Sequence, residues 1–597
     1  MAKPIIPIFY ACDDAFVKYT VVSLHSMMAN ADPNYQYHVH ILHTEITPRV
    51  RRSFQKMEAE NVKIFFEDVS SYLETLSSRL PIRDYYSKTT YFRLFIAEMF
   101  PEYNKAIYID SDTVVQGDIS KMYLTDIGDA YVGACHEQAM VQVDEYGTYV
   151  EKVLGISRHA FFNAGVLLIN CRRFREGRIL DKFVTLLGTY NFVVTQDEDY
   201  LNVLCKDHVY WLDQRWNTEI FGEIPYPIEE AYVLHYIMTS KPWHYRDCRH
   251  GDLFWKYASE TYVYEEIRKV LDAYTDEERA RDAASCEALL QMALREIDRE
   301  DNYLKVLNKK TRSADRVAIL EKIEAYERAG RFGEDVEEDP PSRVLMPDEI
   351  DYLKKSLWQR LKTKHAFAIA HKFVHKLMKE KKMIVKEIRG IENLRELDSG
   401  AIITCNHFNA FDSFAIQLAY EAADQPKRTF YRVIREGNYT SFPGFYGYLM
   451  RNCNTLPLSS HHKTLKKFSD AVSTLLRDGH FVLVYPEQSM WWNYRKPKPL
   501  KKGAYIFAAK NNVPVLPCFI TMKDSDILGE DGFPVQEYTI HVSAPIYPDE
   551  SLRYGEKVEK LAAQNFAVWK GIYEAEYGIP LIYTTESTAD EGEMSSL

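Results

Sequence analysis

Short apolar runs alternate with amphipathic stretches from residue 5 to about residue 272 of the chain. The runs have the length of buried β-strands, and the stretches between them are long enough to form helices. Strands that alternate with helices are typical of a sheet with helices on its faces, so we expect an α/β fold. The apolar runs are IPIFYA (6–11), VHILHT (39–44), VKIFFED (62–68), AIYID (106–110), AYVGAC (130–135) and AGVLLIN (164–170).

The pattern changes twice further along the chain. Residues after 275 have helical spacing until the acidic stretch GRFGEDVEEDPPS (330–342), which has the composition of a linker. From residue 346 a long helical pattern precedes short β-rich runs, and this indicates a second α/β domain. The last segment is polar and is expected to be disordered. We therefore divide the chain into a first α/β domain at residues 1–275, a helical and acidic linker at 276–345, a second α/β domain at 346–583 and a disordered tail at 584–597.

Composition narrows the functional classes. A net charge of −12 argues against nucleic acid as the partner. The nine cysteines include no CxxC pair, so neither a disulfide framework nor a zinc site is indicated. The first residues lack the layout of a signal peptide, and no apolar run reaches the length of a membrane span. We expect a cytoplasmic protein.

One segment nevertheless has the features of a membrane-surface helix. Between Lys354 and Lys382 there are ten Lys or Arg residues and one acid, Glu380, and apolar residues recur at helical spacing. A basic amphipathic helix in an acidic protein predicts contact with anionic lipid, on the inner face of the membrane. The alternative is an ordinary helix that packs its apolar face on the domain.

The run AIYID ends at two aspartates one residue apart, Asp110 and Asp112. Carboxylates at this spacing after a strand can converge on a divalent cation, or the strand can simply end in solvent. The same triplet, DSD, recurs at 524–526, where we expect it only to end a strand, so spacing alone does not decide. Downstream, Asn, Asp, His and Lys residues occur within or next to apolar strand-like runs. A site that holds a sugar and a diphosphate would require such polar side chains. A His could complete the metal shell, and a Lys could neutralise a leaving phosphate.

These segments together resemble glycosyltransferase family 8, whose members are retaining galactosyl- and glucosyltransferases that use UDP-sugars. The resemblance covers roughly residues 4–270 and implies a Rossmann-like nucleotide-sugar fold of the GT-A type, a UDP-hexose donor and Mn²⁺ or Mg²⁺. It assigns the metal to Asp110, Asp112 and His235, and the diphosphate to Lys241. It implies uridine contacts for Ala11 and Asp13, and donor-sugar contacts for Arg93, Asn163, Gly165 and Asp197. The segments are YACDD (10–14), SKTTYFRLFIAEMFP (87–101), AIYIDSD (106–112), FFNAGVLLIN (161–170), TQDEDYLN (195–202) and LHYIMTSKPWHY (234–245).

Two positions depart from that family's pattern. Glu198 stands where the family usually has Gln in a D-Q-D motif, and Met238 stands where it usually has Gly. A carboxylate near the anomeric carbon could stabilise oxocarbenium charge or act as a nucleophile, which would make Glu198 catalytic. Alternatively, Glu198 forms a salt bridge with a neighbour.

The second domain contains a His and an Asp five residues apart, His407 and Asp412, directly after the strand-like run AIITC (401–405). A His beside a carboxylate can act as a general base, although a single such pair is more often structural.

The segments around this pair resemble the glycerolphosphate and lysophosphatidate acyltransferase family over roughly residues 385–545. This implies that His407 deprotonates an acceptor hydroxyl, that Asp412 orients His407, and that an acyl thioester is attacked directly. The acyl donor would be acyl-CoA or acyl carrier protein, and Glu487 matches the glutamate of the F-P-E-G-T-R block. The segments are GIENLRELDSGAIITCNH (390–407), VYPEQSMW (484–491), PLKKGAY (499–505) and VPVLPCFI (513–520).

The departures from this second family concern arginines that hold the acceptor phosphate. Gln488 and Met490 replace the Gly and Arg of the glutamate block, and NTLPLSSHH (454–462) lacks the Arg of the preceding block. Bidentate Arg is hard to replace, so we favour a neutral sugar or glycolipid hydroxyl as acceptor. The basic run RKPKPLKK (495–502) could still supply phosphate contacts.

We therefore expect a bifunctional enzyme that transfers a hexose and a fatty acyl group, with a lipid or glycan acceptor and a shared glycolipid or lipid-linked glycan product. One alternative is that the second domain acylates an unrelated acceptor. Another is that only one domain is active and the other is a scaffold or interaction module.

Overall fold

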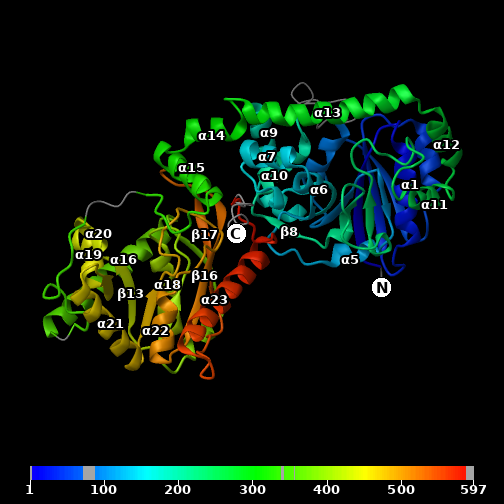
Figure 1. Cartoon of the computed structure of the whole chain (residues 1–597). Coiled ribbons are helices and arrows are strands. Elements are labelled where there is room, and N and C mark those ends of the chain that lie inside the picture. The colour runs from blue at the N-terminus through cyan, green and yellow to red at the C-terminus, as the bar shows by residue number, and fades with distance from the viewer. Residues whose placement is uncertain (1–2, 71–87, 338–341, 355, 586–597) are drawn as a thin grey trace, which may run out of the picture. The chain divides into compact units, whose positions relative to one another are not determined.

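The computed structural model describes residues 3–70, 88–337, 342–354 and 356–585. The chain forms two compact units, Met1–Leu307 and Asn308–Leu597, and each is built around a mainly parallel sheet (Figure 1). The predicted α/β class is therefore confirmed for both halves. The three predicted boundaries between the predicted segments stay predictions, and most of the predicted tail lies outside the described residues.

The first unit has a seven-stranded sheet in the order β3-β2-β1-β4-β7-β6-β8. All neighbouring strands are parallel except β7, which runs antiparallel to β4 and β6. Side chains alternate between two apolar cores: Tyr108 of β4 packs on one face, and Ile107 and Ile109 pack on the other. Burial of both faces explains why these strands read as continuous apolar runs. The strands are β1 (Ile5–Ala11), β2 (Gln36–His43), β3 (Val62–Asp68), β4 (Ala106–Ile109), β6 (Val132–His136), β7 (Phe162–Ile169) and β8 (Val209–Trp211).

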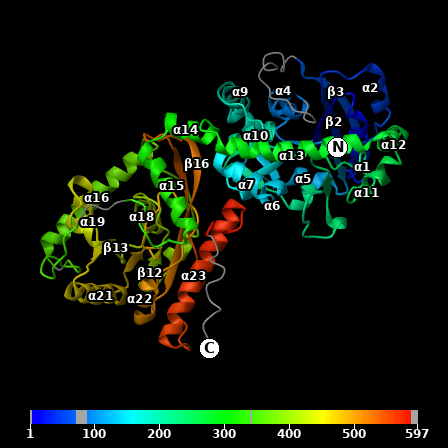
Figure 2. The same ribbon diagram turned by 45° about the horizontal axis from the view of Figure 1, so that its top comes forward.

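A small second sheet in this unit has the order β5-β10-β9, with β5 (Thr113–Val115), β9 (Thr218–Glu219) and β10 (Val233–His235). The long helix α13 belongs to the same unit and packs along α7, as both views show (Figure 2). The helices are α1 (Val17–Ala29), α2 (Pro48–Gln55), α4 (Ile96–Met99), α5 (Ile119–Leu124), α6 (Gln138–Gln142), α7 (Asp144–Tyr149), α8 (Cys171–Glu176), α9 (Ile179–Thr189), α10 (Asp197–Cys205), α11 (Gly251–Ala258), α12 (Tyr264–Ala273) and α13 (Asp276–Asp298), and α14 (Tyr303–Thr311) contains the boundary between the units.

The second unit has a seven-stranded sheet in the order β11-β17-β16-β12-β15-β13-β14. Only the pair β16 and β17 is antiparallel. The strands are β11 (Ile384–Arg389), β12 (Ala401–Thr404), β13 (Phe430–Arg435), β14 (Thr455–Leu458), β15 (Phe481–Val484), β16 (Val515–Leu528) and β17 (Pro534–Val542). The helices are α15 (Ala314–Arg328), α16 (Leu357–Lys379), α17 (Ile391–Arg395), α18 (Asp412–Ala423), α19 (Glu436–Thr440), α20 (Gly444–Asn452), α21 (His462–Arg477), α22 (Gly503–Asn511) and α23 (Tyr554–Tyr577).

The second DSD triplet, 524–526, lies inside β16 rather than after it, which corrects the expectation that it ends a strand. Pairing with β17 includes Asp524 and resumes at Leu528 after an irregularity, and the carboxylate of Asp524 accepts a hydrogen bond from Arg495 at 2.8 Å. Among the described residues, none of the helices combines the length and the apolar character needed to cross a bilayer.

Candidate active sites

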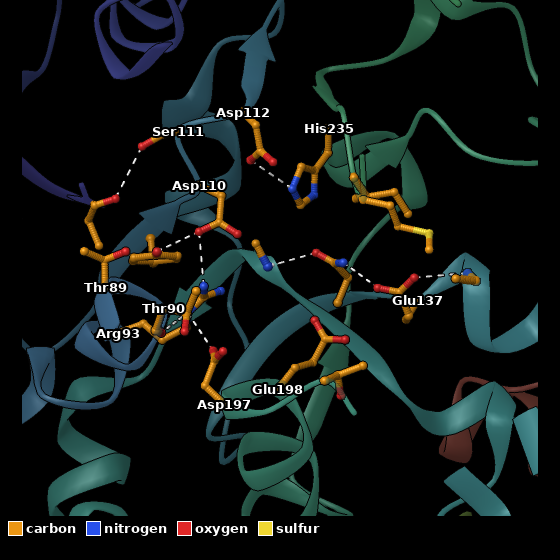
Figure 3. Close-up of a pocket in the computed structure, with 18 of the residues that line it drawn as sticks. Thr89, Thr90, Arg93, Asp110, Ser111, Asp112, Glu137, Asp197, Glu198 and His235 are labelled. Carbon is orange, nitrogen blue, oxygen red and sulfur yellow. Dashed lines mark hydrogen bonds and ion pairs between the residues drawn. The ribbon is translucent and has the colours of Figure 1, made fainter. Parts of the chain in front are cut away.

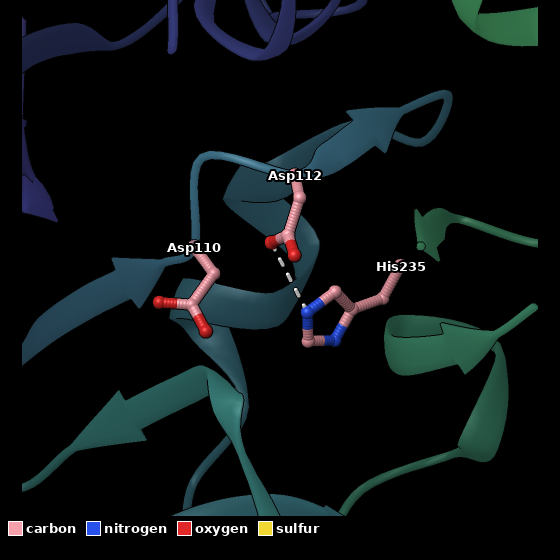
Figure 4. Close-up of side chains that lie close together, drawn as sticks. All are labelled: Asp110, Asp112 and His235. Carbon is pink, nitrogen blue, oxygen red and sulfur yellow. Dashed lines mark ion pairs between the residues drawn. The ribbon is translucent and has the colours of Figure 1, made fainter. Parts of the chain in front are cut away.

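Asp110 and Asp112 lie at the carboxyl end of the central strand β4. Asp110 directly follows β4 and Asp112 directly precedes β5, so the chain turns between the two carboxylates. His235 ends β10, and the antiparallel pairing of β10 with β5 places it opposite Thr113. Ligand atoms of Asp110, Asp112 and His235 all lie within 4.8 Å of one another, with His235 Nε2 3.3 Å from Asp112 Oδ1 (Figure 4).

A relay of side-chain amides assigns the tautomer of His235. The backbone N–H of Gly165 donates to Oδ1 of Asn163 at 2.8 Å, which fixes the orientation of that amide. The same oxygen accepts a hydrogen bond from Nδ2 of Asn217 at 2.8 Å. Oδ1 of Asn217 therefore faces Nδ1 of His235 at 3.1 Å and accepts its proton. Nε2 is left with its lone pair toward the carboxylates.

These residues fit a divalent cation. Gly165 supplies necessary space, because a Cβ there would lie 2.2 Å from Cε1 of His235 and 2.8 Å from Oδ2 of Asp110. Burial alone would raise the pKa of Asp112, but Lys241, whose Nζ lies 2.6 Å from Oδ2, holds it well below its usual range. Two carboxylates and an unprotonated imidazole nitrogen are ligands that Mn²⁺ and Mg²⁺ accept.

Arg93 joins the aspartate turn to the start of α10. Its buried guanidinium lies 3.2 Å from Oδ1 of Asp110 and 3.1 Å from Oδ2 of Asp197 (Figure 3). It also donates to the carbonyl of Ala164 and lies over the ring of Tyr108. Burial raises the pKa of Asp197 to about 6, although Arg93 opposes this. These contacts fix Arg93 beside the three candidate metal ligands, Asp110, Asp112 and His235.

The strongest electrostatic influence on Glu198 from a charged neighbour is the carboxylate of Glu137, and the guanidinium of Arg93 acts more weakly in the opposite direction. Its Oε2 accepts the backbone N–H of Ala164 at 2.8 Å. Burial, and then the carboxylate of Glu137, raise the pKa of Glu198 well above its usual range. Within the described residues no Lys or Arg lies at ion-pair distance from Glu198, so the salt-bridge interpretation has no partner here.

One pocket brings together most of the residues predicted for the first site. Asp13 is not among its lining residues, and its carboxylate accepts the N–H groups of Ala15 and Phe16 in the turn before α1. Met238 lines the pocket with φ +56°, a left-handed conformation that suits the glycine usual in the family. The predicted residues that line it are Ala11, Arg93, Asp110, Asp112, Asn163, Gly165, Asp197, Glu198, His235 and Lys241.

Several lining or supporting residues were not predicted. Thr90 lines the pocket and lies in the segment 87–101, but it was not named as a site residue. Glu137 also lines the pocket and Asn217 lies behind it, and neither belongs to a segment that the sequence analysis singled out. Leu289 also lines the pocket, although it belongs to α13 in the segment that the sequence assigned to a linker. Its helical apolar spacing was the only signal, and that spacing does not say what a helix packs against.

The second site centres on His407, which lies in the loop after β12. Its Nδ1 lies 2.6 Å from Oδ2 of Asp412, the first residue of α18, and the backbone N–H of Phe408 donates to the same oxygen at 3.2 Å. Nε2 of His407 is therefore the nitrogen with a free lone pair. His407 and Asp412 thus have the geometry of a general base and its orienting carboxylate.

Glu487 holds the backbone of this loop. Its buried carboxylate accepts the N–H of His407 at 2.9 Å through Oε2 and the N–H of Lys498 at 2.8 Å through Oε1. Burial raises the pKa of Glu487, while Lys498 opposes the shift. Glu487 therefore contacts the main chain of the dyad rather than its imidazole.

The basic run 495–502 is largely neutralised by carboxylates within the unit. Arg495 pairs with Asp524 and Lys502 with Glu559, while buried Lys498 lies 3.9 Å from Glu487. Lys496 pairs with Glu327 at 2.6 Å. These cations are thus engaged internally, which weakens the expectation that this run supplies phosphate contacts.

Comparisons with known proteins find one family match in each unit. Residues 7–247 match Glycosyl transferase family 8, and residues 386–521 match the Acyltransferase family. A putative glycosyltransferase of Haemophilus influenzae is 28% identical over 260 residues, which are 41% of this chain and 74% of that protein. The lipopolysaccharide glucosyltransferase WaaO of Escherichia coli is 27% identical over 178 residues, 28% of this chain and 52% of that protein. A crystal structure of the galactosyltransferase LgtC with donor and acceptor sugar analogues is 26% identical, with a TM-score of 0.37 over 45% of this chain and 100% of that one.

This chain thus carries a glycosyltransferase family 8 domain at residues 7–247 and an acyltransferase domain at residues 386–521, and it is a transferase with both kinds of catalytic domain.

Proposed function

We propose that the first unit transfers a hexose from a UDP-sugar to a hydroxyl, with retention and with dependence on Mn²⁺ or Mg²⁺. The observation that carries this is the convergence of Asp110, Asp112 and His235 in one pocket with Arg93 and Lys241. A divalent cation held there would offset the charge of the diphosphate. The ammonium of Lys241 would bind a phosphate oxygen.

The test is release of UDP from a panel of UDP-hexoses, with Mn²⁺, Mg²⁺ or chelator. We expect metal-dependent release with at least one donor, and loss of at least a hundredfold in Asp112→Ala. Asp524→Ala is the matched control, because it removes an aspartate of the second DSD triplet, at 524–526, which belongs to the other unit. Undiminished UDP release in chelator, or in Asp112→Ala, would contradict the proposal.

We propose that the second unit transfers a fatty acyl group from acyl-CoA or acyl carrier protein to a hydroxyl. Nε2 of His407 would take the hydroxyl proton while the oxygen attacks the thioester carbonyl. The carbon–sulfur bond then breaks, and the thiolate takes the proton back from His407. His407→Ala should abolish thiol release from acyl-CoA while leaving UDP release unchanged. Equal thiol release in His407→Ala would rule out this role.

The acceptor that fits best is a neutral sugar or glycolipid hydroxyl. Gln488 and Met490 lack the charge that an acceptor phosphate needs, and most cations of the run 495–502 pair with carboxylates of the same unit. We therefore expect a neutral glycolipid to accept acyl groups faster than glycerol 3-phosphate does. The opposite ranking would overturn this choice.

Peripheral binding to anionic lipid, at the inner face of the membrane, is supported by the two parts of α16. Ala366, Val374 and Leu377 are buried against the domain. Leu357 and Trp358, in contrast, are 76% and 75% exposed at the start of the helix. An exposed apolar turn on a basic helix suits an interfacial role.

A further inference from the structure

The hydroxyl of Tyr485 contacts the His407–Asp412 pair, although no step described above uses it. Tyr485 directly follows β15, and its hydroxyl donates to Oδ1 of Asp412 at 2.8 Å. Its ring stacks on the imidazole of His407, with centroids 4.2 Å apart and planes inclined by 23°. One side chain thus contacts both members of the dyad.

The contacts of Asp412 show why this hydroxyl matters. The carboxylate is 1% exposed and forms no ion pair with a Lys or Arg among the described residues. Oδ2 accepts hydrogen bonds from His407 and from the N–H of Phe408, whereas Tyr485 is the donor to Oδ1. A buried carboxylate needs such donors to stay ionised. Without the hydroxyl of Tyr485, Oδ1 of Asp412 would lose this hydrogen bond.

The other titratable and charged groups around the pair are consistent with a donating phenol. Burial, and then Asp412, raise the pKa of Tyr485 well above its usual range, so the hydroxyl keeps its proton. Burial likewise keeps Cys405, at the end of β12, a neutral thiol by raising its pKa. Tyr538 of β17 makes no hydrogen bond to Asp412 among the described residues, and its hydroxyl oxygen accepts a hydrogen bond from Nδ2 of Asn409. Arg432 of β13 bonds to Gln417 instead.

We propose that Tyr485 is a positioning residue of the acyltransferase site, which orients Asp412 through its hydroxyl and the imidazole of His407 through its ring. The hydroxyl draws charge of the carboxylate away from the imidazole and so limits how strongly His407 holds a proton. The ring fixes the plane in which Nε2 presents its lone pair. In the family block F-P-E-G-T-R this position is Phe, so the hydroxyl is a departure of this chain.

The test compares Tyr485→Phe with wild type in the full chain, using thiol release from palmitoyl-CoA. The ring stack survives in Tyr485→Phe, whereas the donor to Oδ1 is lost. We expect kcat to fall about tenfold, the effect of one hydrogen bond to a charged group, with little change in KM. The acidic limb of the pH–kcat profile should move to higher pH, because the unshared carboxylate charge favours the imidazolium.

Tyr505→Phe is the matched control, since it removes a buried hydroxyl of the same unit that has no hydrogen-bond partner. We expect wild-type kcat and pH profile in Tyr505→Phe. A Tyr485→Phe enzyme with wild-type kcat and acidic limb would overturn the proposal, as would a loss that Tyr505→Phe shares.

A second readout does not depend on acyl donor or acceptor. The protonation midpoint of the His407 ring can be followed by NMR in chain labelled with ¹³C-histidine, with His407→Ala to assign the signal. The midpoint should rise in Tyr485→Phe, and an unchanged midpoint would overturn the proposal even if palmitoyl-CoA is not turned over. Failure of acyl transfer itself shows separately, as equal activity in wild type and His407→Ala.

Discussion

Among single residues, Asn217 determines which nitrogen of His235 carries the proton, although Asn217 does not itself line the pocket. It connects His235 to a chain of amides that ends at the backbone N–H of Gly165. Since that N–H can only donate, every later amide in the chain has one favourable orientation. The free nitrogen of His235 is therefore set by main-chain geometry.

We predict that Asn217→Ala weakens Mn²⁺ binding by about tenfold or more, the usual cost of losing a group that orients a metal-binding His. Free and bound Mn²⁺ can be measured by electron paramagnetic resonance without any sugar donor. Asn34→Ala, which changes an exposed asparagine, should bind Mn²⁺ as wild type does. Equal affinity in Asn217→Ala would refute the orienting role.

Asp199 predicts a pH dependence of stability. Its buried carboxylate accepts bonds from Thr195 and Tyr149, yet burial raises the pKa of Asp199 from 3.8 to about 7. Between these values the native state holds a proton that the unfolded chain has released. Stability therefore falls as pH rises from about 4 to 7, by at most about 4 kcal/mol, and the loss is complete above pH 7.

The measurement is the thermal midpoint of wild type and Asp199→Asn between pH 4 and 8. The Asn side chain at position 199 is uncharged over this pH range, so the wild type should lose stability relative to Asp199→Asn as the pH rises to 7. Exposed Asp298→Asn should parallel wild type. Parallel curves for wild type and Asp199→Asn would mean that Asp199 titrates normally.

At the scale of elements, the sequence predicted strands better than it predicted what helices do. Runs such as AIYID and AIITC were recognisable because both faces of each sheet are buried, and their polar ends located Asp110 and the loop that contains His407. The contribution of α13 could not be predicted, since Leu289 reaches the pocket only through packing of residues distant in sequence. Glu137 and Asn217 likewise depend on strand pairing.

Helix α16 combines the two roles that its sequence pattern predicts, since one part packs on the domain and another part is exposed as a membrane-surface helix would be. Its later turns pack on the domain, while Leu357, Trp358 and Leu361 remain exposed. Lys362 and Lys364 have no carboxylate partner among the described residues, so their charge is available to an anionic surface.

We predict that Trp358→Ala with Leu361→Ala lowers partitioning onto phosphatidylglycerol vesicles at least tenfold, through lost apolar burial. Sedimentation with vesicles measures this, and phosphatidylcholine vesicles should bind weakly in every case. Leu124→Ala, at another exposed leucine, is the control. Unchanged partitioning in the double variant would leave α16 without a lipid role.

At the scale of the whole molecule, the two chemistries rest on separate hydrophobic cores. Asp110 and Asp112 depend on the sheet of the first unit, and His407 depends on the sheet of the second. Sites that share no partner residues usually behave additively when mutated. A common product is then the simplest reason for joining both activities.

We predict that wild type, given a UDP-[³H]hexose, [¹⁴C]acyl-CoA and a bacterial lipid extract, makes one lipid that carries both labels. Asp112→Ala should remove the tritium and His407→Ala the carbon label from that lipid, which thin-layer chromatography resolves. Labels that always migrate in separate lipids would show that the two domains act on unrelated acceptors.

The bare backbone of Gly165 has a practical consequence. Because a single methyl group would occupy the space between His235 and Asp110, Gly165→Ala should disable sugar transfer while keeping every ionisable group and the net charge of the chain. In cells, Gly165→Ala would therefore show the effect of blocking the site without any change in charge, whereas replacement of an aspartate changes the shape and the charge of the site together.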